Sequence, residues 1–458
     1  MTATRPTWQP PAWSGAAGVA RQDVTAPVGI RMRNWGYGDR DVARTVHRPL
    51  TLTALALADA DGADPSLLLT ADLGWWRSTA DETRVRGAVL AATGLSADRV
   101  LLHLTHTHAG PSICADDHDL PGGELVDAYL DRLAARAVAA ATTALADLRP
   151  ATMQWATAHH GLAAVRDLTL DGRALLAFDP AVPADDTLLV GLVSDQDGAP
   201  VATLVNYACH PTTLGWDNDA LSPDYPGAMR AVVEPATGVP CLFLQGASGD
   251  LGPREQYGAD TDLADRHGAG LGHAVLGALA TLPAPGTALV CTGVVESGAP
   301  LGVWEPVPTP SASARGSVAT QVPVELKALA PIDELERQWA HIDPRSRAER
   351  LRRAERLRRT YADMSAPVHP LWVWRFGDVV VVAHPGEAYS ALQTTLRARF
   401  PQLAVVVLNL TNGPGWVYLP TRQSYDQERY QSWQTLVQAG SLERLVDAAQ
   451  AAVAELLG

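Results

Sequence analysis

Two histidines spaced two residues apart stand at the end of an apolar run, in the segment Leu-Thr-His-Thr-His-Ala-Gly-Pro at 104–111. Residues 99–105 are typical of a strand, and the Gly-Pro pair indicates a turn after it. Because side chains alternate along an extended segment, His106 and His108 are predicted to lie on the same face. Two such imidazoles can bind a metal ion, or one can bind it while the other transfers protons. A hydrogen-bonded pair that caps a strand is the simpler interpretation.

Three more side chains that could take part in catalysis or ligand binding also follow runs that are typical of strands. His210 precedes a proline that ends a strand, Asp250 lies in a glycine-rich turn, and Glu387 follows a Pro-Gly pair. In α/β proteins, catalytic and ligand-binding side chains commonly lie at the ends of strands. Each residue also has a simpler role: a structural histidine, an ordinary tight turn, and an acid in the first turn of a predicted helix.

Other segments are suggestive but have equally simple explanations. Tyr418 follows the Gly/Pro-rich turn 412–417 and fits a packed aromatic residue, whereas Asp116 and Asp117 fit a polar surface loop. Ser248 invites a serine-hydrolase interpretation, but its surroundings do not match the G-x-S-x-G nucleophile elbow.

The elements that must position these residues follow from hydrophobic periodicity. Strands are predicted at 51–59, 66–72, 99–105, 188–194, 200–207, 240–244, 288–295, 371–383 and 403–409. Helices are predicted at 79–92, 124–147, 224–235, 262–281, 331–362, 386–399 and 441–457. This mixture indicates an α/β protein with mixed β-sheets flanked by helices. The proline-rich stretch 302–320 is predicted to be a long flexible loop within a single domain of residues 1–458.

Composition excludes several classes of protein. The 458 residues carry a formal net charge of -14, with 47% hydrophobic and 19% charged residues, so nucleic acid is not an expected partner. The one arginine-rich stripe, 345–359, is interleaved with acids at helical spacing, which is typical of a solvated helix face. No apolar run approaches the roughly 18 residues that span a bilayer, so no membrane insertion is expected. The four cysteines form no CxxC pair, which favours free thiols and a cytoplasmic location.

The set of motifs resembles the catalytic domain of the neutral/alkaline ceramidase family. The resemblance extends from about Gly18 to about Leu445. Its most specific parts are Thr-His-Thr-His-x-Gly-Pro at 105–111 and the tail Tyr-x-x-Thr-x-x-x-Tyr-x-x-x-Arg-Tyr at 418–430. The His-Pro, Gly-Asp and Pro-Gly-Glu segments fall in the order that the family requires.

The resemblance implies one zinc ion per chain and a role for each matching residue. The implied zinc ligands are His106, His210, Glu387 and Tyr418. His108 would be the acid/base histidine, Arg166 would lie near the substrate carbonyl, and Asp250 matches the aspartate of the family's Gly-Asp-x-Ser-Pro element. The chemistry is coherent, because zinc accepts nitrogen and oxygen ligands and can activate a water molecule at an open position.

Two departures from the family bear on mechanism and substrate. Gly252 occupies the position of the family serine, so a mechanism that needs this hydroxyl as nucleophile cannot operate, which favours attack by water or signals lost activity. Asp116, Asp117 and Gly249 are predicted to contact the substrate, and the two acids suit a polar or cationic molecule better than a sphingoid chain. No C-terminal β-sandwich domain of the family's kind is expected.

The sequence therefore predicts a zinc-dependent amidohydrolase that cleaves the amide bond of a small or N-acylated metabolite by metal-activated water. One alternative is an esterase or lactonase with the same centre, and another is an inactive homologue that binds a small molecule. The oligomeric state is left open.

Overall fold

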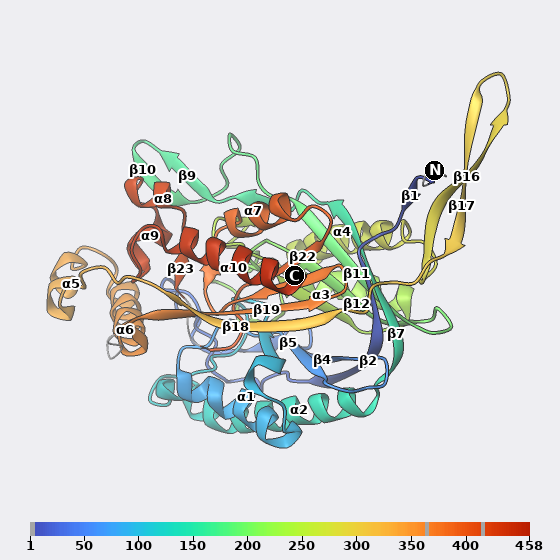
Figure 1. Cartoon of the computed structure of the whole chain (residues 1–458). Coiled ribbons are helices and arrows are strands. Elements are labelled where there is room, and N and C mark those ends of the chain that lie inside the picture. The colour runs from blue at the N-terminus through green and yellow to red at the C-terminus, as the bar shows by residue number, and fades with distance from the viewer. Residues whose placement is uncertain (1–4, 362–365, 414–416) are drawn as a thin grey trace.

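Two stacked β-sheets form the middle of the molecule, and helices cover their outer faces (Figure 1). The computed structural model describes residues 5–361, 366–413 and 417–458. The mixed β-sheets with flanking helices confirm the predicted fold class.

In the described part of the chain the larger sheet has eight strands, in the order β14-β12-β11-β7-β2-β4-β5-β6. Their bounds are β2 Ala12–Asp23, β4 Thr51–Ala58, β5 Ser66–Ala71, β6 Val100–Leu104, β7 Arg149–His159, β11 Thr187–Asp195, β12 Pro200–Tyr207 and β14 Cys241–Gln245. The smaller sheet has the order β18-β19-β20-β22, with bounds Arg315–Pro323, Val368–Phe376, Val379–Ala383 and Ala404–Leu408.

The period-two alternation of apolar residues explains the stacking. In β20, Val379 and Val381 face the core between the sheets, whereas Val380 and Val382 face the outer core beside the helices. Trp13 of β2 packs edge-on against Phe376 of β19, with ring centroids 5.3 Å apart. Strands buried on both faces read as nearly continuous apolar runs, which is why most of them are visible in the sequence.

Helices complete the outer layers. On the larger sheet lie α1 Thr79–Thr93, α2 Val126–Ala146, α3 Tyr225–Thr237 and α4 Thr261–Leu279, and on the smaller one α7 Ala391–Arg399 and α10 Ser441–Leu457. Local signals set some of these ends: the Ser78 hydroxyl accepts from the N–H groups of Ala80 and Asp81, and α1 ends at Gly94, whose φ is 70°.

Shorter elements surround this body. The strands are β1 Thr7–Trp8, β3 Thr45–Val46, β8 Ala163–Val165, β9 Asp167–Leu170, β10 Arg173–Leu176, β13 Ala220–Leu221, β15 Leu251–Pro253, β16 Thr287–Glu296, β17 Pro300–Pro308, β21 Glu387–Ala388 and β23 Tyr418–Leu419. The helices are α5 Ile332–Gln338, α6 Pro344–Tyr361, α8 Arg422–Asp426 and α9 Tyr430–Gln434, with 3₁₀ turns at Ala97–Arg99, Ala115–Asp117 and Gly123–Leu125. The β16–β17 hairpin extends away from the body (Figure 1).

Several predicted elements are wrong. The predicted loop 302–320 is largely β17 and β18, which are edge strands, where proline is tolerated because one side of the strand needs no partner. The predicted helix 331–362 is two helices, because the chain turns before Pro344. The predicted strand 371–383 is the hairpin β19–β20, which turns at Gly377 with φ 59°. The helix predicted at 386–399 begins only at Ala391.

Among the described residues, no helix is long and apolar enough to cross a membrane. All four cysteines are free thiols.

Candidate active site

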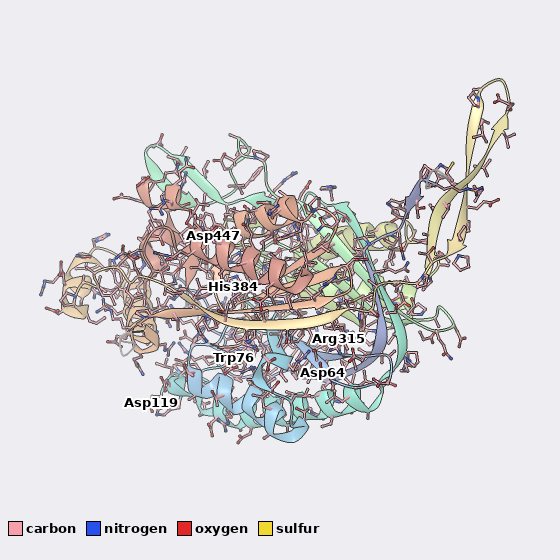
Figure 2. The ribbon with its side chains drawn as sticks, viewed as in Figure 1. Asp64, Trp76, Asp119, Arg315, His384 and Asp447 are labelled. Carbon is pink, nitrogen blue, oxygen red and sulfur yellow. The ribbon has the colours of Figure 1, made fainter. Side chains whose placement is uncertain are left out.

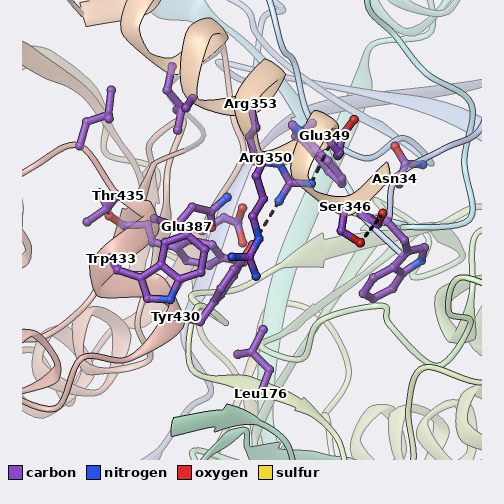
Figure 3. A pocket seen from close by; sticks show the side chains of 18 of the residues that line it. Asn34, Leu176, Ser346, Glu349, Arg350, Arg353, Glu387, Tyr430, Trp433 and Thr435 are labelled. Carbon is purple, nitrogen blue, oxygen red and sulfur yellow. Dashed lines mark hydrogen bonds and ion pairs between the residues drawn. The ribbon is translucent and has the colours of Figure 1, made fainter. Parts of the chain in front are cut away.

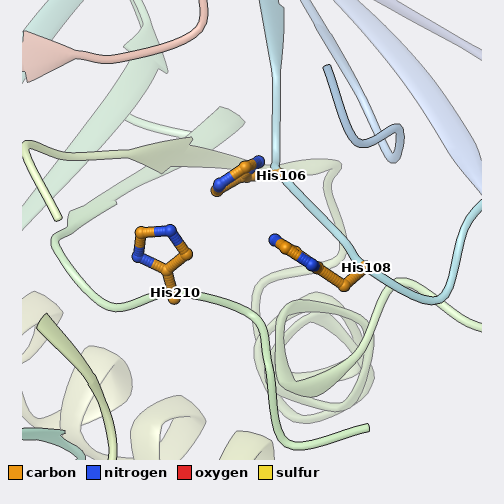
Figure 4. Close-up of side chains that lie close together, drawn as sticks. All are labelled: His106, His108 and His210. Carbon is orange, nitrogen blue, oxygen red and sulfur yellow. The ribbon is translucent and has the colours of Figure 1, made fainter. Parts of the chain in front are cut away.

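Three histidines face one another at one end of the larger sheet (Figure 4). One ring nitrogen each of His106, His108 and His210 lies within 4.8 Å of the others. His106 and His108 follow β6, and His210 follows β12. His106 and His108 lie close together, with ring centroids 4.9 Å apart, but not by the strand alternation that the sequence predicted. The strand ends at Leu104, and His106 has a left-handed backbone with φ 71°.

Glu387 and Tyr418 reach the histidines from a short parallel strand pair. They are register partners in β21 and β23, so their backbones are fixed side by side. Oε2 of Glu387 lies 3.2 Å from Nε2 of His106 and 3.0 Å from Nε2 of His210. Glu387 is therefore not the helix first-turn acid that the sequence allowed. Pro414, Gly415 and Trp416, in the turn before Tyr418, lie outside the described residues.

Hydrogen bonding fixes which nitrogen of each histidine faces Glu387. Nδ1 of His106 lies 3.2 Å from the carbonyl oxygen of Gly74, and Nδ1 of His210 lies 2.7 Å from that of Ser248. A carbonyl oxygen only accepts, so both Nδ1 atoms carry the proton and both Nε2 atoms present lone pairs to the carboxylate. Lone pairs that converge on an anionic oxygen are the donor set of a bound cation, with the carbonyls orienting its ligands.

The protonation states suit this arrangement. Burial, followed by the charge of Arg166, lowers the pKa of His210 to about 3. Burial, and then the charge of Glu387, raise the pKa of the Tyr418 phenol well above its ordinary value.

Arg166 brings a permanent charge to the same place from the junction of β8 and β9. Its Nη2 lies 3.1 Å from Nε2 of His210 and donates to the hydroxyl of Tyr418 at 3.2 Å. It also donates to the carbonyl oxygen of Gly249 at 3.0 Å. Burial acts to lower the pKa of Arg166, but Tyr418, Tyr257 and Glu387 outweigh it and raise it. The guanidinium is therefore charged at every relevant pH.

His108 differs from the other two histidines because neither ring nitrogen has a hydrogen-bond partner among the described residues. Its ring lies between Trp35 and Trp75, with centroids 4.9 and 5.0 Å away. Burial, followed by the charges of His106 and His210, lowers its pKa well below 6.5. A neutral imidazole with two buried, unpartnered nitrogens thus lies in the lining of a cavity.

This cavity has a volume of about 650 Å³, and His106, His108, Arg166, Glu387 and Tyr418 line one end of it. Figure 3 shows the cavity, with Glu387 labelled among its lining residues. This volume is typical of small-molecule sites. Eight further aromatic residues line its walls: Trp35, Tyr37, Trp75, Trp216, Tyr257, Trp339, Tyr430 and Trp433. One face of α6 lines another side.

Comparison with known proteins places this arrangement in a fold. No protein-family model matches the sequence, and no curated protein matches it. The crystal structure of neutral ceramidase from Pseudomonas aeruginosa matches 98% of this chain and 75% of its own, with a TM-score of 0.69 and 16% identity. A ceramidase complexed with C2 matches 98% of this chain and 76% of its own, with a TM-score of 0.66 and 15% identity.

The chain has the neutral ceramidase fold. The resemblance inferred from the sequence motifs is therefore confirmed at the level of fold. Within this fold, His106, His108, His210, Glu387, Tyr418 and Arg166 lie close together, and the sequence had singled out all six.

Asp116 and Asp117 do not line the cavity of this ceramidase-like fold, so the structure gives no support to the prediction that they contact the substrate. Asp117 is buried and pairs with Arg77 at 3.1 Å and with Arg356 of α6. Asp116 is exposed and pairs with Arg359, and the nearby Asp119 lies at the edge of the molecule (Figure 2). A loop of consecutive acids gave no signal that buried arginines would neutralise one of them.

Asp250 and Gly249 support the centre without facing the cavity. Both Asp250 carboxylate oxygens contact Ser390, at 2.7 Å to its N–H and 2.6 Å to its hydroxyl, rather than a histidine. Gly249 holds Arg166 through its carbonyl. A Cβ at Gly249 would lie 2.9 Å from the carbonyl oxygen of Glu387, so the close approach of these segments requires glycine.

The sequence missed the basic wall of the cavity. Arg350, Arg353 and Arg358 of α6 line it, together with Lys327. The arginine stripe was visible, but it was interpreted as a solvated helix face, because spacing along a helix does not reveal what lies opposite.

Proposed function

We propose that the protein is a zinc-dependent hydrolase that cleaves the amide bond of small N-acylated molecules. The observation that carries this proposal is the convergence of two Nε2 lone pairs on one buried carboxylate oxygen, at the end of a cavity. The ceramidase-like fold supports the reaction class.

Zinc would be held by His106, His210, Glu387 and Tyr418. When bound, the ion polarises a carbonyl group and lowers the pKa of a water molecule to near ~7. Its positive charge would also offset the burial that raises the pKa of the Tyr418 phenol.

Two residues of the chain would act on the substrate directly. Arg166 keeps a fixed positive charge beside Tyr418, which stabilises negative charge that develops on the amide oxygen. His108 is neutral and has free nitrogens, so it accepts a proton from the attacking water and returns it to the leaving amine. The aromatic walls hold the acyl group and exclude bulk water from the centre.

The structure offers no support for a serine nucleophile. The Ser248 hydroxyl accepts from Nε2 of Gln245 at 2.6 Å, and only the Ser248 carbonyl contacts His210. Gly252, at the position of the family serine, carries no hydroxyl, and a Cβ there would lie 3.4 Å from Cδ of Arg166.

The proposal is tested by measuring zinc per chain together with amine release from N-octanoyl ethanolamine, with a matched octanoyl ester in parallel. His106→Ala is expected to lose both zinc and amine release. His108→Gln is expected to retain zinc and lower the turnover rate by about 10²- to 10⁴-fold. His159→Ala, which removes an exposed histidine of β7, is the matched control and keeps both.

Wild-type protein with less than about half an equivalent of zinc would contradict the metal site. Cleavage of the ester without the amide would replace the amidohydrolase with an esterase. Loss of zinc in His108→Gln would make His108 a ligand rather than a proton carrier.

A further inference from the structure

The cavity has a charge opposite to that of the chain. The whole sequence has a net charge of -14. The cavity lining nevertheless contains five permanent or usual cations against two carboxylates, Glu349 and Glu387. The cations are Arg166, Lys327, Arg350, Arg353 and Arg358. The positive electrostatic potential of this cavity, in an otherwise acidic protein, attracts negatively charged molecules.

Both carboxylates of the cavity already have partners. Glu387 lies between His106 and His210. Glu349 pairs with Arg352 at 2.8 Å and with Arg353 at 3.8 Å. Among the described residues, no carboxylate is left for the remaining cations at the outer end of the cavity.

Arg350 is the cation of this outer end that makes the fewest polar contacts. Its guanidinium carbon lies 5.0 Å from the ring centre of Trp433 and 5.8 Å from that of Trp339. Within the described chain it makes no hydrogen bond or ion pair, so the N–H groups at the edge of its plane are available to a ligand. Figure 3 shows it with Tyr430 and Trp433 on the same side of the cavity.

Lys327 approaches the same tryptophan from another segment. Its ammonium donates to the carbonyl oxygens of Ser432 at 2.8 Å and Trp433 at 3.5 Å. It has no carboxylate partner in the described structure, and burial lowers its pKa to about 8. Two cations from separate segments of the chain thus both contact Trp433 without a counter-charge.

A short path joins this place to the histidines. The ring of Tyr430 lies 5.2 Å from that of Trp433 and 5.8 Å from that of Tyr418. Arg353 donates to the Tyr430 hydroxyl at 3.1 Å. Tyr430 therefore lies beside both Tyr418 and Trp433, and a molecule that extends past Tyr430 can contact the histidine end of the cavity and Arg350 together.

We propose that Arg350 and Lys327 bind an anionic group, a carboxylate or a phosphate, on the amine portion of an N-acylated substrate. Guanidinium and ammonium groups bind these anions through charge-assisted hydrogen bonds, and the planar guanidinium does so with two parallel donors. The placement of the amide at the histidines rests on the proposed function, whereas the anion site does not.

The test uses three probes with one acyl group: N-octanoyl-β-alanine, the O-phosphate of N-octanoyl ethanolamine, and neutral N-octanoyl ethanolamine. Dissociation constants are measured by stopped-flow quenching of the cavity tryptophans, before turnover. At least one anionic probe is expected to bind wild-type protein about tenfold or more tightly than the neutral one, a difference of about 1.4 kcal/mol. The stronger of the two anionic probes identifies the anion as carboxylate or phosphate.

Variants on two separate elements guard against an effect of folding. Arg350→Gln and Lys327→Met are each expected to reduce the anion preference severalfold, with the affinity for the neutral probe unchanged. Arg350→Lys, which keeps the charge, retains part of the preference. Arg347→Gln removes a charge from the same helix outside the cavity lining and leaves the preference intact.

Equal binding of all three probes overturns the proposal, as does a preference that survives in both Arg350→Gln and Lys327→Met. Amine release tests the proposed hydrolase activity independently of the anion site. A preference for anionic probes without amine release would support the anion site and contradict the hydrolase. Amine release without such a preference would support the hydrolase and contradict the anion site.

Discussion

At the scale of single residues, Asp250 shows how a buried carboxyl group near the centre links stability to pH. Burial, with a smaller contribution from the charge of Asp167, raises its pKa to about 6 against the opposing hydrogen bonds from Ser390. The folded protein therefore binds this proton more tightly than the unfolded chain, whose aspartates titrate near ~3.9. The contribution of this raised pKa to the free energy of unfolding is fully present below pH ~4 and is lost as the pH rises through about 6.

We expect Asp250→Asn to weaken this pH dependence. The amide oxygen still accepts from the Ser390 N–H, and the amide nitrogen donates to its hydroxyl, so the variant imitates the protonated acid. The difference in unfolding free energy between pH 4 and pH 7 should shrink by on the order of 2 kcal/mol. Urea denaturation at a series of pH values measures it. Asp224, whose pKa burial also raises to about 6, leaves a residual slope in the variant. Identical slopes in both proteins would contradict the prediction.

At the scale of elements, α6 is held over the cavity by charge pairs that centre on Asp117. This buried carboxylate contacts Arg356 of α6 and also Arg77, which donates to the Asn34 side chain at 2.7 Å. Asn34 in turn donates to the carbonyl oxygen of Gly110, in the turn after the histidines, at 2.9 Å. Asp117 thus connects the basic wall to the segment that carries His106 and His108.

Asp117→Asn should therefore destabilise the protein and weaken substrate binding together. It leaves Arg77 and Arg356 without the buried carboxylate that they share, a change that typically costs about 3–5 kcal/mol. Chemical denaturation gives the loss of stability, and KM for the anionic probes should rise as α6 loosens. Asp116→Asn is the matched control, because its exposed pair with Arg359 contributes at most about 1 kcal/mol. Equal effects of the two substitutions would refute the central role of Asp117.

Sequence patterns predicted the helices and strands better than they predicted the contacts between distant segments. Buried strands such as β22 were found because they are continuous apolar runs, and the chemistry of His106, His210 and Glu387 was found because few other residues can do it. The α5–α6 break and the proline-containing edge strand β17 were missed, because a proline ends a helix or marks an edge only in a known context. The neutralisation of Asp117 and the inward face of α6 depend on contacts between segments far apart in the chain, which periodicity cannot reveal.

At the scale of the whole molecule, the proposed zinc site connects parts of the chain that only the folded state brings together. Its four ligands come from the ends of β6 and β12 and from the β21–β23 pair, so an unfolded chain cannot assemble them. A ligand that binds only the folded state stabilises it by RT ln(1 + [L]/Kd), which is about 2.7 kcal/mol at a hundredfold excess over Kd. Removal of zinc with a chelator should therefore lower the unfolding free energy, and added zinc should restore it. His106→Ala should be insensitive to both treatments, whereas His159→Ala should respond as the wild-type protein does, because His159 lies exposed on β7. A wild-type protein whose unfolding free energy ignores both chelator and zinc would show that the buried carboxylate and histidines hold each other without a metal ion.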